Sequence, residues 1–197
     1  MSKFWDERYS QVDYVYGILP NEFFKEQIGK LLPGKLLLLG EGEGRNAVYA
    51  AKLGWQVDAV DFSEEAKKKA LRLAEKNHVS INYTVQSLDN FIPAKSNYDA
   101  AAIIFLHLDK ELSGIVHKRA IDSLKPAGKI ILEVFEKDQI GKPSGGPQTA
   151  DLLYTTDEIK NNFEELFTEI LSKETVILSE GEFHSGEGTV VKFVGVK

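Results

Sequence analysis

The chain of 197 residues is 43% hydrophobic and 27% charged, which is ordinary for a folded globular protein and excludes a disordered chain, a coiled coil or a membrane protein. It contains 0 cysteines, which excludes disulfides, thiolate metal sites, iron–sulfur clusters and cysteine nucleophiles. Its net charge of −6 opposes a large phosphate-binding surface, so we expect a small-molecule partner and no nucleic acid.

No apolar run reaches the roughly 20 residues that span a bilayer, and the start of the chain lacks the apolar core of a signal peptide. We therefore expect a cytoplasmic protein without a membrane partner. No repeat or polar linker divides the chain, which predicts one domain over residues 1–197, with an N-terminal lid or helical segment (1–33), a cofactor-binding core (34–136) and a C-terminal helix and hairpin (137–197). The oligomeric state stays open, because no heptad or exposed apolar stripe announces an interface.

From Lys35 onward, short apolar runs alternate with amphipathic stretches, a pattern that predicts a parallel sheet covered by helices. The first expected elements are a strand at Lys35–Leu39, a helix at Asn46–Leu53, a strand at Gln56–Asp61, a helix at Glu64–Asn77 and a strand at Ile81–Val85. They are followed by a strand at Tyr98–Leu106, a helix at Lys110–Leu124 and a strand at Lys129–Phe135.

The last part of the chain predicts a different arrangement. The loop Gly141–Pro147 is rich in turn formers and precedes a helix at Thr156–Phe163. Two strand-like runs, Glu169–Leu178 and Gly188–Val196, lie so close together that they predict an antiparallel hairpin.

Two helix starts carry capping residues. Ser63 precedes two glutamates, and its hydroxyl can accept hydrogen bonds from the first backbone N–H groups of the helix. The stretch Thr155–Glu158 has the pattern of a helix cap and needs no functional interpretation.

The strongest local pattern is the segment Gly40–Gly44 (GEGEG), which directly follows the buried strand at Lys35–Leu39. Glycine at every second position allows a tight turn and a close approach of the backbone to a ligand. The next strand ends at Asp61, 21 residues after Gly40, the interval at which an acid binds ribose hydroxyls in nucleotide-binding α/β folds. Together they predict a nucleoside pocket; glycines that serve packing alone are the alternative.

The residues of this turn discriminate between nucleoside cofactors. A dinucleotide site needs a glycine three residues after the second glycine, and Arg45 stands there. A pyrophosphate would also lie beside Glu41 and Glu43, whereas the ammonium and sulfonium of S-adenosylmethionine are compatible with carboxylates. The turn therefore favours a cationic cofactor.

At these residues the sequence resembles the class I S-adenosylmethionine-dependent methyltransferases, within them the group of tellurite-resistance and thiol or thiopurine-type methyltransferases. Gly40–Ala47 resembles the group's first motif, Val60–Ser63 its ribose-binding strand end, and Leu124–Gly128 the turn before its fifth strand. Looser matches are Trp5–Tyr9, Tyr14–Gly17, Phe105–Leu108, Gly145–Pro147 and His184. The likeness covers nearly the whole chain. It implies a Rossmann-like α/β fold with a seven-stranded, mainly parallel sheet, a C-terminal antiparallel hairpin and helices on both faces.

The resemblance also implies S-adenosylmethionine as cofactor and assigns its contacts: the turn glycines at the methionine portion, Asp61 at the ribose, Phe62 at the adenine face, and Ser87 with Leu88 at the adenine edge. The predicted cofactor-binding residues, with no metal ligand among them, are Gly40, Glu41, Gly42, Gly44, Arg45, Asn46, Asp61, Phe62, Ser63, Ser87, Leu88 and Phe105. The chain departs from the group at Ser87 and at Leu38, where many relatives carry acids; Glu41 and Glu43 are candidates to hold the cofactor ammonium instead.

Methyl transfer by in-line displacement depends on alignment and needs no protein nucleophile, although a His or Tyr can act as general base. The catalytic candidates are His107, which follows the fourth strand, and Tyr16. A capping or solvated His107 is an equal alternative. Tyr14 and Tyr16 pack in the core or form a lid over the cofactor, with packing preferred. Glu133 is interpreted as an exposed edge residue, with an acceptor-facing role as the alternative, and His184 as a solvated turn residue.

These observations predict a single-domain enzyme that methylates a small acceptor: a thiol, a metalloid oxyanion or a heterocycle. Two alternatives stay open. A non-catalytic S-adenosylmethionine-binding protein would keep the cofactor site without turnover, and an NAD(P)-dependent oxidoreductase would share the sheet, although Arg45 and the two loop glutamates oppose it.

Overall fold

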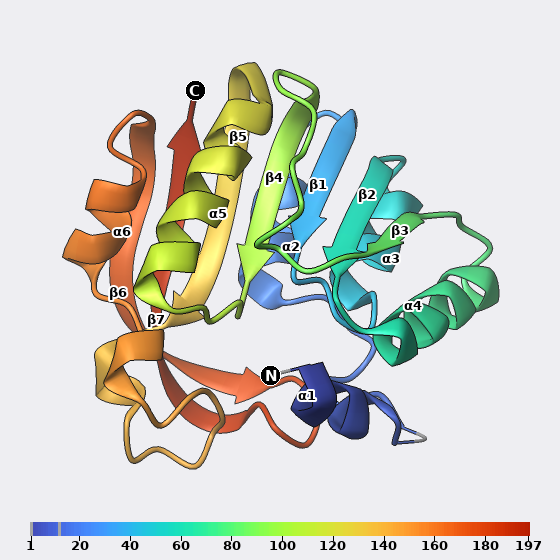
Figure 1. Ribbon diagram of the computed structural model, residues 1–197, viewed down its shortest axis with the longest axis horizontal. Helices are drawn as coiled ribbons and strands as arrows, with labels where there is room; N and C mark the ends of the chain where they lie inside the picture. The colour runs from blue at the N-terminus through green and yellow to red at the C-terminus, as the bar shows by residue number, and fades with distance from the viewer. Residues whose placement is uncertain (1, 12) are drawn as a thin grey trace.

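The computed structural model describes residues 2–11 and 13–197 and contains a seven-stranded sheet in the order β3-β2-β1-β4-β5-β7-β6 (Figure 1). Strands β1 to β5 are parallel, and β7 is antiparallel to both of its neighbours. This topology confirms the predicted methyltransferase-like sheet with its C-terminal hairpin. The strands are β1 Lys35–Leu39, β2 Gln56–Asp61, β3 Asn82–Val85, β4 Tyr98–Ile104, β5 Leu124–Phe135, β6 Phe167–Ser179 and β7 Ser185–Val196.

The four helices predicted after Lys35 lie at their predicted positions, with ends that differ by no more than one residue. Ser63 caps α4 by accepting from the Ala66 N–H at 3.2 Å, and Thr155 with Glu158 forms a capping box at α6, so both predicted caps are confirmed. The helices are α1 Ser2–Tyr9, α2 Glu22–Ile28, α3 Arg45–Lys52, α4 Glu64–Lys76, α5 Lys110–Ser123 and α6 Thr156–Asn162, with short 3₁₀ turns η1 Lys137–Gln139 and η2 Ala150–Leu152.

Strand β5 begins earlier than predicted. Leu124 already pairs with Tyr98 of β4, and the ladder shifts register before Ala100, so the Pro126–Gly128 turn is an irregularity at the start of the strand. The Ala127 N–H donates to the Lys197 carbonyl at 2.9 Å, which ties this turn to the end of β7. Such long-range pairing leaves no pattern in the local sequence.

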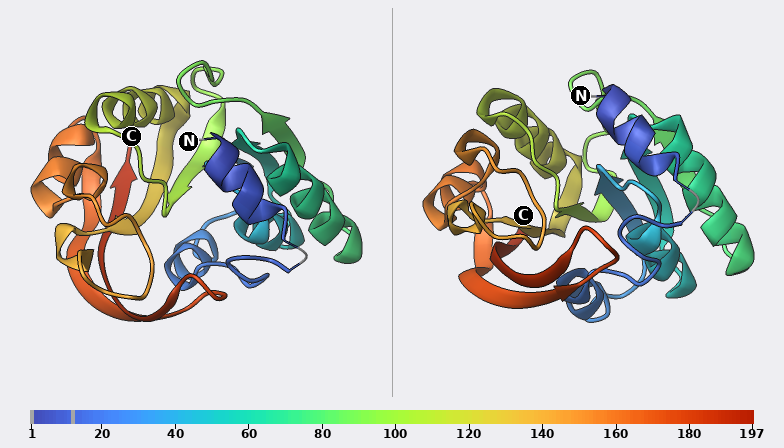
Figure 2. Two further views of the ribbon diagram at one scale, coloured as in Figure 1. Left: turned by 60° about the horizontal axis from the view of Figure 1, so that its bottom comes forward. Right: turned by 90° about the horizontal axis from the view of Figure 1, so that it is seen from below.

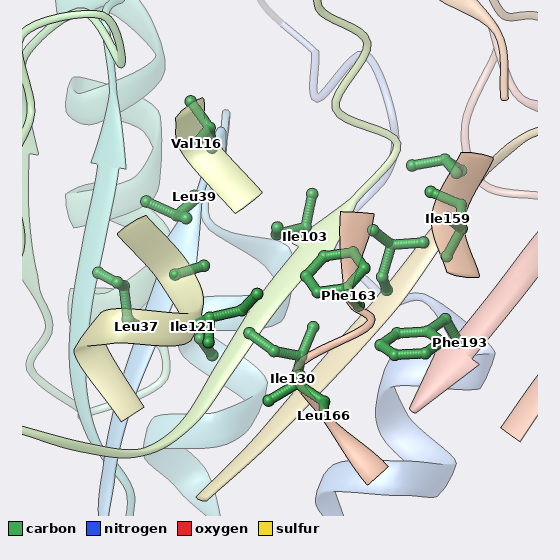
Figure 3. Packing of buried hydrophobic residues seen from close by; sticks show 14 of the residues in the cluster. Leu37, Leu39, Ile103, Val116, Ile121, Ile130, Ile159, Phe163, Leu166 and Phe193 are labelled. Carbon is green, nitrogen blue, oxygen red and sulfur yellow. The ribbon is translucent and has the colours of Figure 1, made fainter. Parts of the chain in front are cut away.

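Helices cover both faces of the sheet, as predicted. On one face, α5 and α6 pack against alternate residues of the strands, among them Leu37, Ile103 and Ile130 (Figure 3). On the other face, Leu36 and Leu38 pack with apolar residues of α2, α3 and α4. Alternation of this kind is how a parallel strand buries both faces, and each fully buried Leu or Phe contributes roughly 1.5–3 kcal/mol.

The long hairpin β6–β7 curves beneath the carboxyl edge of the parallel strands, toward the N-terminal segment (Figures 1 and 2). Its tip touches that segment directly: a Cβ added to Gly181 would lie 2.4 Å from the Val15 carbonyl oxygen. The Arg8 guanidinium of α1 lies 4.4 Å from the ring centroid of Phe183 in the tip. The carboxyl edge, where ligands bind in open α/β sheets, is therefore covered by two segments from opposite ends of the sequence.

Candidate active site

The glycine turn runs from the end of β1 into α3 with all three glycines at positive φ, a conformation that other residues rarely adopt. A Cβ would be crowded at each of them, at Gly40 by the Leu106 Cδ1 at 2.6 Å. A Cβ on Gly42 would lie 2.9 Å from the Tyr9 hydroxyl, and a Cβ on Gly44 would lie 2.6 Å from the Ala70 Cβ of α4. Gly44 thus permits the close packing of α3 on α4, whereas Gly42 leaves room beneath α1.

Asp61 lies directly beneath this turn, at the carboxyl end of β2. Its Oδ2 accepts from the Gly42 N–H and its Oδ1 from the Ser63 N–H, both at 3.0 Å. Burial raises the pKa of Asp61 despite these hydrogen bonds. Ser63 is itself engaged, because its hydroxyl donates to Asp6 of α1 at 2.5 Å.

Glu41 carries a carboxylate without a cationic partner. It accepts from the Ala47 N–H at 2.7 Å and makes no ion pair within the part of the chain that the structure describes. Burial raises its pKa to about 7, against the opposing effects of this hydrogen bond and of Arg45. A nearby ligand cation would favour its ionised form.

The carboxylate of Glu43, by contrast, has partners within the protein. Its carboxylate accepts from the Val15 N–H at 2.8 Å and from the Lys69 ammonium at 2.6 Å. Lys69 also donates to the Asp13 carbonyl at 2.6 Å, and both charged side chains are buried. This ion pair fastens the N-terminal segment to the glycine turn, and the Lys69 ammonium already neutralises the Glu43 carboxylate.

Arg45 and Asn46, two predicted cofactor residues, contact the protein in this structure. Arg45 donates to the Tyr16 carbonyl at 3.3 Å and forms an ion pair with Glu180 of the hairpin at 2.7 Å. The Asn46 Oδ1 accepts from the Asn21 N–H at 2.9 Å, just before α2. Both residues therefore join the glycine turn to the segments that cover it.

Tyr9 is a residue that the sequence analysis did not single out for the site. Its ring stacks on Trp5 at 5.5 Å between centroids, and the residue is only 7% exposed. Its hydroxyl makes no hydrogen bond with any residue of 2–11 or 13–197, although it faces Gly42. Burial and the nearby Asp61 charge raise its pKa well above the ordinary value, so the hydroxyl keeps its proton.

The loop after β3 holds the predicted adenine-edge residues. The Gln86 N–H donates to the Asp61 carbonyl at 2.9 Å, which brings this loop beside the acid. Arg119 of α5 donates to the Leu88 carbonyl at 2.9 Å and thereby anchors the loop. Leu88 is buried, Phe62 is partly exposed and Ser87 is exposed.

His107 is held by the backbone at both ring nitrogens. Its Nδ1 lies 2.8 Å from the Leu152 carbonyl oxygen, and its Nε2 accepts from the Phe135 N–H at 3.4 Å. Burial lowers its pKa to about 4. A catalytic role for His107 stays a prediction, and these two bonds favour a positioning role instead.

His184 is buried, so the prediction of a solvated turn residue is wrong. It is 6% exposed, because the hairpin curves back over the sheet edge. Its ring lies 4.5 Å from Tyr16, 4.6 Å from Phe105 and 5.2 Å from Phe135, measured between centroids. Two predicted site residues, Tyr16 and Phe105, thus both contact a histidine that the sequence analysis had placed in a solvated turn.

Glu133 is also buried, at 3% exposure, so its interpretation as an exposed edge residue is wrong. Its Oε2 accepts from the Asn21 amide at 2.5 Å, and the same amide donates to Glu180 at 2.9 Å. Burial raises the pKa of Glu133 to about 7, although the Asn21 hydrogen bond opposes the shift. Asn21 carries no motif; only its position before a capped helix could have drawn attention to it.

Residues 36–128 match the family model described as a methyltransferase domain, a span that begins in β1 and ends at the Pro126–Gly128 turn. A curated relative is a probable S-adenosyl-L-methionine-dependent methyltransferase, TehB of Haemophilus influenzae, with 26% identity over 114 residues. The aligned region covers 56% of this chain and 40% of TehB, so the chain spans less than half of that relative.

Solved structures share the fold at lower identity. A protein from the study of conversion of a disulfide bond into a thioacetal group during echinomycin biosynthesis superposes with a TM-score of 0.82 and 13% identity, over 100% of this chain and 91% of its own. TehB from Haemophilus influenzae gives 0.73 and 17%, over 100% and 66%. The [4+2]-cyclase SpnF gives 0.70 and 14%, over 100% and 94%. Because the family match spans both the glycine turn and the strand that ends in Asp61, the chain carries a class I S-adenosylmethionine-dependent methyltransferase domain, distantly similar to TehB.

Proposed function

We propose that this enzyme transfers a methyl group from S-adenosylmethionine to a small-molecule acceptor: a thiol, a metalloid oxyanion or a heterocycle. The observation that carries the proposal is the closure of the carboxyl edge by two segments. Tyr16 of the N-terminal segment and His184 of the hairpin meet at 4.5 Å, and Arg45 is bonded to both segments. A macromolecular acceptor would require these two segments to part, which favours a small acceptor.

The residues around the glycine turn have the chemistry that the cofactor requires. Glu41 supplies a carboxylate without a cationic partner for the ammonium, and Asp61 has acceptor capacity left for ribose hydroxyls. The Tyr9 hydroxyl, unbonded within the described chain, adds a donor beside Gly42. In this proposal the loop residues Phe62, Ser87 and Leu88 surround the adenine, and Phe105 closes the site.

When bound, S-adenosylmethionine supplies an electrophilic methyl group on its sulfonium. The protein contributes alignment and exclusion of water, which are the main sources of acceleration for such a displacement. In this proposal Tyr16 lines the acceptor side of the site through its ring contact with His184. His107 positions Phe135 and the Leu152 backbone around the acceptor through its two hydrogen bonds.

The test is a transfer assay with methyl-labelled S-adenosylmethionine against alkyl and aryl thiols, selenite, tellurite and N-heterocycles, with a bulk protein extract and total RNA in parallel. We expect label in at least one small acceptor and none in protein or RNA. Label confined to protein or RNA would contradict the proposal. The Asp61→Ala variant is the control for cofactor dependence and should lose transfer together with binding of S-adenosylhomocysteine.

A further inference from the structure

A cavity of about 200 Å³ opens between the end of α2 and strands β5, β6 and β7. It lies on the face of the sheet opposite α5 and α6, where Figure 1 shows α2 behind the strands. Its β5 residues come from the start of that strand: Lys129 pairs with Val196, whereas Phe135, at the carboxyl edge, pairs with Val190. Six residues of strand separate Lys129 from Phe135 by roughly 20 Å, so the cavity is distinct from the active site.

Half of the lining is apolar. Leu31 follows α2, and Ile131, Ile170 and Val194 come from three adjacent strands. Ile131 and Val194 are 0% and 2% exposed, so they belong to the core beneath the cavity. An apolar cavity of about 150 Å³ is enough to bind benzene. The space here therefore suits one ring, or a branched alkyl group of similar size.

Gln27 brings a buried amide to the same lining. The residue is 7% exposed, and its Oε1 accepts from the Lys30 ammonium at 3.3 Å. Its Nε2 lies near the Glu26 carboxylate, since the pKa of Glu26 is lowered chiefly by its hydrogen bond to Lys30 and least by Gln27. An amide nitrogen carries two hydrogens, so at least one of them has no acceptor within residues 2–11 and 13–197. A buried donor of this kind favours a ligand that accepts a hydrogen bond.

Two ammonium groups of the lining add further donors. Lys129 donates to both carboxylate oxygens of Glu169, at 2.8 and 2.6 Å, and Lys30 donates to Glu26 at 2.8 Å as well as to Gln27. An ammonium carries three hydrogens, so each lysine keeps one that is not used in its contacts with the described residues. The acceptors of the lining, the Glu169 carboxylate and the Gln27 Oε1, are already engaged by these lysines.

We propose that this cavity is a binding site for a small apolar monocarboxylate of about the size of benzoate. The apolar body packs against the four apolar lining residues, and the carboxylate accepts from Gln27, Lys30 and Lys129. Hydrogen bonds between an ammonium and a carboxylate are charge-assisted and stronger than neutral ones. The site is separate from the glycine turn, so the proposal does not depend on the proposed function.

The same residues disfavour other classes of ligand. A cation would lie against two ammonium groups, while Glu169 already has Lys129 as its ion-pair partner at 2.6 Å. An inorganic anion would leave the apolar half of the lining without a contact. A ligand with two rings exceeds the volume of the cavity.

The experiment is a titration of nitrogen-labelled protein with benzoate, followed by the chemical shifts of the backbone amides. We expect a dissociation constant on the order of 1 mM or tighter, with shifts at the lining residues and none at Gly40–Gly44. Benzamide has nearly the same shape without the charge and should bind at least about fivefold more weakly.

Two variants test the two halves of the lining. Ile170→Phe places a larger side chain in the cavity and should weaken benzoate binding at least about tenfold. Ile177→Phe is the matched control in the same strand, at a position that is 77% exposed, and should leave the affinity unchanged. Gln27→Leu removes the amide at similar size and should weaken benzoate binding by about tenfold. Thermal unfolding close to that of wild type shows that each variant folds.

Several results would overturn this site. They are the absence of shifts at about 20 mM benzoate, shifts confined to the glycine turn, and an unchanged affinity in both Ile170→Phe and Gln27→Leu. Equal affinities for benzoate and benzamide would overturn the carboxylate. Shifts of the lining residues that depend on protein concentration without benzoate would instead assign this face to a contact between two copies of the chain.

Discussion

Glu133 shows how a single buried carboxyl links this protein's stability to pH. Its folded-state pKa of about 7 lies above the ordinary 4.5, so the folded protein binds this proton more tightly than the unfolded chain does. The contribution of Glu133 to stability is therefore lost as pH rises from about 4.5 through 7. Above pH 7 the buried charge has Asn21 as its hydrogen-bond partner but no ion pair within the described chain.

The Glu133→Gln variant should raise the free energy of unfolding at pH 8 by up to about 3 kcal/mol and leave it unchanged near pH 4.5, because the amide keeps the Asn21 hydrogen bond and carries no charge. Urea unfolding at the two pH values measures this difference. The exposed Glu75→Gln of α4 is the matched control and should change neither value by more than about 0.5 kcal/mol. An equal effect of Glu133→Gln at both pH values would contradict the raised pKa.

At the scale of elements, the contact between α3 and α4 depends on the absence of a side chain at Gly44. Gly44→Ala should lower the free energy of unfolding by about 2 kcal/mol or more, because φ is +89° and the new Cβ would overlap Ala70. Gly114→Ala in α5, where a Cβ meets nothing within 4 Å, should instead raise it by about 0.5–1 kcal/mol. Urea unfolding measures both changes in free energy, and changes of opposite sign would support the packing explanation. Similar losses of stability in the two variants would refute it.

The N-terminal segment is fastened by the buried Glu43–Lys69 pair, at 5% and 7% exposure. Lys69→Met should lower the free energy of unfolding by about 3–5 kcal/mol. The substitution leaves the Glu43 carboxylate buried, with the Val15 N–H as its remaining hydrogen-bond donor. Adding Glu43→Gln should recover part of that loss. A double-mutant cycle in urea measures the coupling, and additive single effects would mean that the pair does not act as a unit.

The whole molecule should respond to its cofactor through mass action. S-adenosylhomocysteine at about 100 times its dissociation constant adds about 2.7 kcal/mol to the stability of the folded state, which corresponds to roughly 5–10 °C in Tm for a chain of this size. Thermal unfolding by circular dichroism should show this shift for wild type and none for Asp61→Ala. NADH serves as the control ligand and should not shift Tm. A shift in Tm with NADH alone would favour the alternative that the protein is an oxidoreductase.

In the part of the chain that the structure describes, no helix is long and apolar enough to cross a membrane.

The cover over the carboxyl edge is a property of the whole molecule. Asn21 and Glu180 are 159 positions apart in sequence and lie in hydrogen-bond contact. Arg45, the first residue of α3, joins the two covering segments.

The sequence by itself was sufficient for the glycine turn, the acid at the end of β2, the order of strands and helices from Lys35 onward and the two helix caps. These features depend on periodicity and on side chains a few residues apart, so their physical causes are local. The resemblance through Gly40–Ala47 and Val60–Ser63 supplied the cofactor class, which the family match supports. The start of β5 was missed because it depends on pairing with β4 and on the distant C-terminus.

Only the tertiary structure decided which polar residues are buried. From sequence, His107 and His184 are two histidines near predicted strand ends, yet backbone groups occupy both nitrogens of His107 and leave Nε2 of His184 unbonded within the described chain. The difference arises because the hairpin is long enough to curve under the sheet and meet the N-terminal segment. Burial of this kind depends on contacts between segments far apart in the chain, which no local pattern of residues encodes.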